Sequence, residues 1–96
     1  MGELKDDISA LELKIGQLKV QYDQYFTRQI KLEPLRLRDE VEKIILFHTN
    51  QPVNSTTLKF RFNSAMAKYN SYKHYWTRTV RSMEDGKYTG GRSETG

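Results

Sequence analysis

The residue types best suited to binding a partner lie together in the C-terminal half of the chain. The segment 58–78 holds the only Trp, three of the six Tyr and two of the four Phe, and five Lys or Arg alternate with these rings. Aromatic rings can stack on nucleic-acid bases while basic side chains contact the phosphates. The same rings at helical spacing build a protein core instead. The spacing of the rings must therefore decide between nucleic-acid binding and core packing.

That spacing assigns most of the rings to helix–helix packing. From Leu58 onward, apolar residues recur at alternating steps of four and three, which is typical of a buried helical stripe. A second stripe with the same steps occupies the N-terminal segment. We call the two stripes together the seam. Its predicted members are Ile8, Leu11, Ile15, Leu18, Tyr22, Tyr25, Leu58, Phe62, Tyr69, Tyr72 and Trp76.

Two aromatic residues, Phe60 and Tyr75, do not fit the seam and point to the opposite side of the last helix. This second face has small residues in its middle. We expect either that a middle helix covers Phe60 or that the face contacts a partner helix, with nucleic acid as a third alternative. The predicted members of this interaction face, with the bases that edge it, are Phe60, Arg61, Lys68, Ser71, Tyr75, Arg78 and Arg81.

The bases of the last helix are spread around it and do not form one stripe. A duplex groove or a phosphate track requires a stripe, so RNA or DNA binding is the alternative function and not the leading one. The chain also lacks paired zinc ligands, a Gly-rich phosphate loop and the aromatic motif of RNA-binding sheets.

Signals for catalysis and metal binding are weak. The chain has no Cys and only two His, which excludes thiolate chemistry and Cys-based zinc sites. His48 follows an apolar helix face and is expected to be structural, whereas His74 is expected to be exposed. The adjacent carboxylates at 6–7 and 39–40 lie on polar faces, where burial would not tune their pKa values. We therefore expect no enzyme activity, no metal and no cofactor.

Positioning the seam requires three helices, predicted at 6–30, 34–48 and 55–85. Pro34 suits the first turn of the second helix, Asn54 or Ser55 can cap the third, and Gly86 can stop it. Gly16 interrupts the first helix and marks either the close approach of a neighbour or a weak point.

The predicted fold is all-α, an antiparallel, coiled-coil-like helical hairpin with a short connecting helix packed at its turn end. The C-terminal half of the first helix should then meet the N-terminal half of the third. Residues 1–86 are expected to form a single domain, and 87–96, rich in Gly, Ser and Thr, a disordered tail.

Charge and hydropathy limit the location and the partners. The net charge is +4, with an acidic first helix and a basic last one. These two helices either pair with each other or leave an anion-binding face. The longest apolar run, residues 44–47, is far shorter than the ~20 residues needed to span a bilayer, and no signal-peptide order precedes it. We expect a cytoplasmic protein without a membrane partner.

Four sequence elements resemble a known family. They are Tyr22-x-x-Tyr25-Phe26, the run from Glu33-Pro34 to Ile44, Leu58-Lys-Phe-Arg-Phe-Asn-Ser and Ala67-Lys-Tyr-Asn-x-Tyr72-x-x-Tyr75-Trp76-x-Arg78. They are similar to a small helical domain of myxobacteria and other deltaproteobacteria, which is free-standing or C-terminal in signalling-type proteins. The resemblance covers roughly residues 18–88 and implies a bacterial interaction domain. It carries no catalytic residue or ligand.

The sequence therefore predicts a non-enzymatic protein-interaction or scaffolding module. One hairpin cannot cover all of the apolar seam, so we expect the chain to self-associate through it. The partner is then a second copy of the chain, in a homodimer, or a protein of unknown identity.

Overall fold

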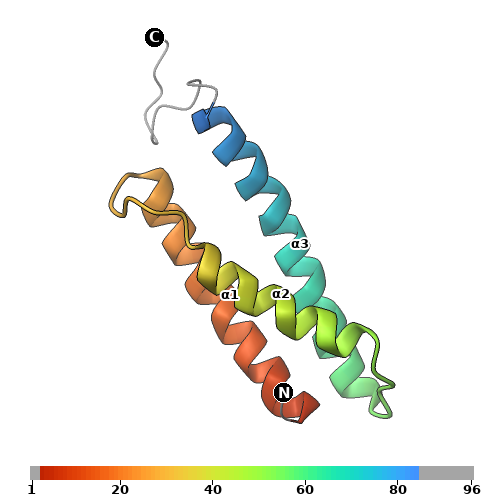
Figure 1. The fold of residues 1–96 in the computed structure, drawn as a ribbon. Coiled ribbons are helices and arrows are strands. Elements are labelled where there is room, and N and C mark those ends of the chain that lie inside the picture. The colour runs from red at the N-terminus through yellow and green to blue at the C-terminus, as the bar shows by residue number, and fades with distance from the viewer. Residues whose placement is uncertain (1–2, 85–96) are drawn as a thin grey trace.

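The computed structural model describes residues 3–84, and all regular structure in that range is helical. Helix α1 covers Leu4–Phe26, α2 covers Leu35–Thr49 and α3 covers Thr56–Glu84 (Figure 1). The predicted all-α class with three helices is confirmed. The predicted tail and the predicted stop at Gly86 lie outside the described residues.

Helix α1 ends about one turn earlier than predicted. The backbone N–H of Arg28 donates to the carbonyl of Tyr25 (3.1 Å), and that of Gln29 donates to the carbonyl of Gln24 (2.7 Å). These two bonds form a Schellman motif, which requires one residue in the left-handed region. Arg28 supplies it with φ 64°. Because Gly normally occupies this position, an Arg gave no signal that the helix ends here.

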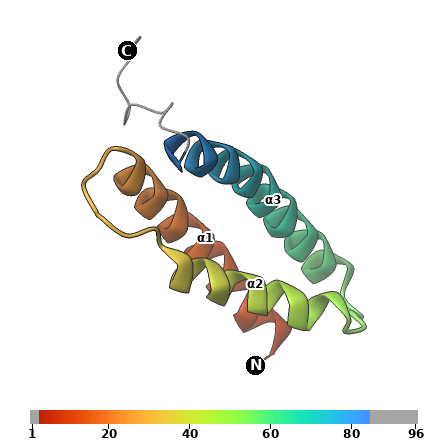
Figure 2. The ribbon, with the colours of Figure 1, turned by 45° about the horizontal axis from the view of Figure 1, so that its top comes forward.

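Helices α1 and α3 run in the same direction, and α2 runs in the opposite direction along α1 (Figures 1 and 2). Asp7, near the start of α1, contacts His48 at the end of α2, with Oδ2 and Nε2 2.6 Å apart. Tyr22, near the end of α1, stacks on Trp76 in the C-terminal half of α3. The antiparallel hairpin is therefore formed by α1 and α2. The prediction that the C-terminal half of the first helix meets the N-terminal half of the third was wrong.

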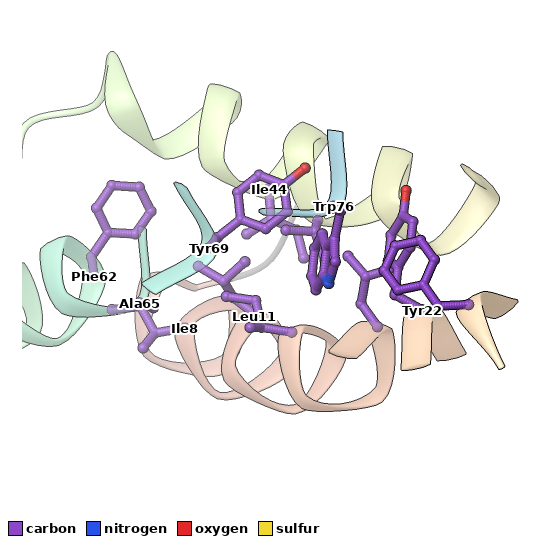
Figure 3. Packing of buried hydrophobic residues seen from close by; sticks show 12 residues of the cluster. Ile8, Leu11, Tyr22, Ile44, Phe62, Ala65, Tyr69 and Trp76 are labelled. Carbon is purple, nitrogen blue, oxygen red and sulfur yellow. The ribbon is translucent and has the colours of Figure 1, made fainter. Parts of the chain in front are cut away.

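The core lies along α1, which contacts both other helices, whereas α2 and α3 contact each other much less. Tyr22 and Trp76 stack toward the C-terminal end of α1, with ring centroids 4.3 Å apart and planes inclined by 12° (Figure 3). Of the predicted seam members, Tyr25, Leu58 and Tyr72 are only half-buried. The buried apolar residues are Ile8, Leu11, Ile15, Leu18, Tyr22, Phe26, Val41, Ile44, Phe62, Ala65, Tyr69 and Trp76.

Local signals at the other helix ends match the structure. Pro34 lies at the N-cap of α2 with φ −76°. The Ser55 hydroxyl accepts a hydrogen bond from the N–H of Leu58 (3.2 Å), which is the bond expected of a capping Ser. Gly16 is exposed, and a Cβ added to it would meet nothing within 4 Å. This glycine therefore marks no close approach.

The bundle is elongated, with extents of 54 × 19 × 17 Å. No helix among the described residues combines the length and the hydropathy needed to cross a membrane.

Candidate functional site

No helix among the described residues covers the outer face of α3. Phe60 is 70% exposed and Tyr75 is 52% exposed. Between them, Ser64, Ala67 and Ser71 are also exposed. We call these five residues the α3 outer stripe. The expectation that a middle helix covers Phe60 was wrong, because α2 packs mainly on α1.

Two bases of the predicted interaction face lie on the side of α3 that meets α1. Arg61 pairs with Glu12 of α1, with Nη2 and Oε1 2.8 Å apart. Lys68 lines a hollow of about 250 Å³ together with Glu12 and with Ser64 at the edge of the outer stripe, and its Nζ lies 6.0 Å from the centroid of the Tyr72 ring. Neither side chain belongs to the outer stripe.

The other two predicted bases lie further along α3. Arg81 lines a hollow of about 370 Å³ with Glu33 and Arg38, so it faces the start of α2. Arg78 is exposed. The four bases are thus distributed over several sides of α3 and do not form the continuous track that a phosphate backbone would follow.

Tyr75 connects the outer stripe to the core. Its ring meets that of Phe26 at 6.0 Å between centroids, with the planes at 88°. Such edge-to-face pairs are favourable beyond the area that they bury. Tyr75 is therefore held in place on one side while about half of its surface remains open to a partner.

A polar network joins α2 to α3 and was not predicted from the sequence, although Tyr69 was predicted as a seam member. The Tyr69 hydroxyl donates to Oε2 of Glu42 (2.5 Å). The same oxygen lies 3.3 Å from Nζ of Lys73 and 3.5 Å from Nε of Arg38. The Glu42 carboxylate thus accepts a hydrogen bond from one phenol and lies close to two cations.

The same network continues to α1. Arg38 donates from Nη1 to the Tyr22 hydroxyl (3.0 Å), and that hydroxyl donates to Oε2 of Glu33 (2.5 Å). The Arg38 side chain is only 19% exposed and that of Glu33 18%. Arg38 therefore links all three helices, since Tyr22 belongs to α1 and Glu42 bonds to α3.

The electrostatics of this network keep its phenols protonated. Burial is the main cause that raises the pKa of Tyr22 and Tyr69 well above the ordinary value, and their bonds to carboxylates add to it while Arg38 opposes it. The pKa of Glu42 is lowered, chiefly by the hydrogen bond from Tyr69 and then, against the effect of burial, by Lys73 and Arg38. At neutral pH the phenols act as donors and fix helix positions.

His48 and Asp7 form a separate polar contact between α1 and α2. The His48 side chain is 5% exposed, and its ring also packs edge-on against Phe62 at 6.2 Å. No group of three His, Cys, Asp or Glu side chains among residues 3–84 is arranged to hold a metal ion. His74, as expected, is exposed.

Comparisons with protein-family models, with curated proteins and with solved structures find no match to this chain. The resemblance to the deltaproteobacterial domain therefore stays a prediction.

Proposed function

We propose that this protein is a non-enzymatic interaction module that self-associates through the α3 outer stripe, with two copies of α3 side by side and antiparallel. The observation that carries the proposal is the order of the exposed residues along the stripe. An aromatic ring is followed by three small side chains and then by a second aromatic ring.

This order reads almost the same in both directions. When two antiparallel copies of α3 pair about an axis between residues 67 and 68, Phe60 of one copy lies opposite Tyr75 of the other. In the same register Ser64 lies opposite Ser71. A twofold interface needs such self-complementarity, because every contact is made twice.

Packing also favours this pairing. Helices pack with their axes about 8–10 Å apart, and the side chains at the contact set the distance. Ser64, Ala67 and Ser71 permit an approach near the lower limit. The rings of Phe60 and Tyr75 would then meet at both ends of the contact, and aromatic pairs contribute about 0.5–1.5 kcal/mol beyond the area they bury.

The charge near the axis is compatible with pairing. The outer stripe itself is uncharged, and Lys68 beside it leans over the Tyr72 ring on the side of α1. Two Lys68 side chains, one from each copy, still repel each other weakly across the axis. Salt screens this repulsion, so we expect pairing to strengthen modestly with ionic strength.

Most of the seam is buried inside the folded chain, which makes it a poorer surface for self-association than the outer stripe. Leu11, Leu18 and Tyr22 have no exposed surface, because α2 and α3 together cover the face of α1 that they occupy. The proposed contact therefore uses the outer stripe in place of the seam.

Nucleic-acid binding through α3 is the weaker alternative, because Arg61 and Lys73 already pair with Glu12 and Glu42. Catalysis has still less support. The half-buried carboxylates of the network are bound by phenols or cations, which leaves them unsuited to act as bases.

Sedimentation over micromolar to millimolar concentrations tests the proposal. The wild-type chain should show a monomer–dimer equilibrium. Ala67→Lys would add a second cation to each copy directly opposite Lys68 of the other copy, so four like charges would meet at the axis and the equilibrium should shift to monomer. Gln17→Lys adds the same charge on the exposed surface of α1 and serves as the matched control. A wild-type protein that stays monomeric, or an Ala67→Lys protein that still dimerises like the control, would overturn the proposal.

A further inference from the structure

One end of the bundle carries an excess of positive charge. It consists of the loop 27–34, the first turn of α2 and the last turns of α3, which the Tyr22–Trp76 stack places beside the end of α1. We call it the basic end. Five cations there make no ion pair or side-chain hydrogen bond with the described residues: Arg28, Lys31, Arg36, Arg78 and Arg81.

The carboxylates of the basic end do not neutralise these cations. Glu33 is held by the Tyr22 hydroxyl and Arg38, and Asp23 pairs with Lys19 one turn earlier in α1. Glu84, exposed at the end of α3, is the remaining described acid there. The free positive charge therefore exceeds the free negative charge.

Exposed aliphatic side chains lie among the cations. Leu32 is 81% exposed in the loop, directly after Lys31, and Leu35 is 57% exposed, directly before Arg36. Of the exposed large apolar side chains among residues 3–84, Leu32 is the most exposed. An exposed aliphatic side chain surrounded by cations is best matched by a surface whose outer layer is anionic and whose interior is apolar.

The loop that carries Leu32 has a defined start. Its first residues are fixed by the Schellman bonds that end α1, and Arg28 holds the left-handed conformation that Gly would adopt without a steric penalty. The position thus carries a cation where the backbone favours Gly. This observation agrees with a role for the charge and does not depend on the pairing of α3.

We propose that the basic end docks on the surface of an anionic lipid bilayer, with Leu32 entering the headgroup region and the cations facing lipid phosphates and carboxylates. The basic end is the narrow end of a rod 54 Å long, and Leu32 is 81% exposed there. A phosphate backbone gives an exposed aliphatic side chain no apolar contact, and a folded partner would need a matching hollow. A fluid bilayer closes around such a side chain without one. Such peripheral docking requires no spanning helix.

The expected effects follow from the surface electrostatics. Each Lys or Arg near an anionic leaflet contributes on the order of fivefold in partitioning at low salt. Reversing the charges of Lys31 and Arg36 should therefore lower the partition coefficient by about thirtyfold or more. Leu32→Ser should lower it by about tenfold at most, because less apolar surface then enters the interface.

Co-sedimentation with vesicles tests the proposal, using phosphatidylcholine alone and phosphatidylcholine with about one-third phosphatidylserine. The full chain should bind only the anionic vesicles, and binding should fall steeply with salt. Lys31→Glu with Arg36→Glu should lose it. Lys5→Glu with Lys59→Glu, at the opposite end of the rod, makes the same charge change and should lose much less.

Leu46→Ser, which changes another exposed Leu away from the basic end, is the matched control for Leu32→Ser. Circular dichroism checks that all variants keep the helical fold. Three results would each overturn the proposal: no binding to anionic vesicles, equal losses for the variants at the two ends, or binding to a DNA or RNA duplex without binding to vesicles.

Discussion

Replacement of Arg38 by Met tests whether the polar network holds the three helices together. Arg38 bonds to Tyr22 and lies 3.6 Å from Oε2 of Glu33 and 3.5 Å from Oε2 of Glu42. Met keeps most of the aliphatic stem, so packing changes little while the guanidinium is removed. The loss should therefore report on the network itself.

The size of this loss can be bounded from the structure. Removing one partner of a buried ion pair costs about 3–5 kcal/mol, and a hydrogen bond to a charged group contributes about 1.5–3 kcal/mol. Glu33 is 18% exposed and keeps its bond from the Tyr22 hydroxyl, so it is not left without a partner. We expect a loss of about 2 kcal/mol in the free energy of unfolding, which for a domain of this size lowers Tm by about 8–16 °C.

Thermal and urea unfolding followed by circular dichroism measure this loss. Arg36→Met removes an exposed Arg without an ion pair from the same helix and should change the stability by less than about 0.5 kcal/mol. A double-mutant cycle with Glu33→Gln should return a coupling of about 1 kcal/mol, because the two side chains act on each other. The reasoning fails if Arg38→Met is no more destabilising than Arg36→Met.

Four further predictions concern stability. Gly16→Ala should raise the free energy of unfolding by up to ~1 kcal/mol in urea melts, because the site is helical, exposed and open; a loss would show that the glycine is needed. Leu18→Asp should cost more than about 3 kcal/mol or prevent folding, since it places an unpaired charge at a fully buried position, and an unchanged melting curve would contradict the core assignment. The pKa of Glu42 is lowered on folding, so its stabilisation is present above its unfolded pKa of about 4.3 and is lost as pH falls through the folded value. Glu42→Gln should therefore flatten the acid limb of the stability profile, and an unchanged limb would contradict this. The raised pKa values of Tyr22 and Tyr69 act in the opposite direction: their contribution is present below about pH 10 and declines above it, and Tyr69→Phe should flatten the alkaline limb.

The buried stripe of α1 could be predicted because heptad spacing identifies one face of a helix. Ile8, Leu11, Ile15 and Leu18 are buried as their spacing indicates. The spacing becomes less accurate toward the helix end, because a straight helix drifts by about 20° per heptad from a repeat of 3.5 residues per turn. By the third repeat this drift moves the buried position from Tyr25, which was predicted, to Phe26.

The direction of α3 could not be read from the seam, because a stripe indicates which face is buried and not which helix covers it. Helix α2 has 15 residues and spans about 22 Å, two-thirds of the length of α1. It therefore returns the chain almost to the start of α1. The next helix must then run parallel to α1.

The polar network had a partial signal in the sequence. Arg38 and Glu42 are four residues apart, which is ion-pair spacing in a helix, and buried Tyr hydroxyls require partners. Nothing in the sequence paired Tyr22 with Glu33 or Tyr69 with Glu42, because those contacts depend on where α2 lies. The nearly palindromic order of the outer stripe was present in the sequence as well. It became informative once the structure left Phe60 and Tyr75 exposed.

Disulfide cross-linking tests antiparallel pairing of α3 most directly, because the chain has no Cys of its own. Ser64→Cys and Ser71→Cys proteins are oxidised separately and as a mixture. A disulfide needs Cα atoms about 4.4–6.8 Å apart, and seven helical residues span about 10 Å. Antiparallel pairing predicts a mixed cross-linked dimer in the mixture and little cross-linking in either protein alone. Cross-linking within each protein alone, or none in the mixture, would contradict it.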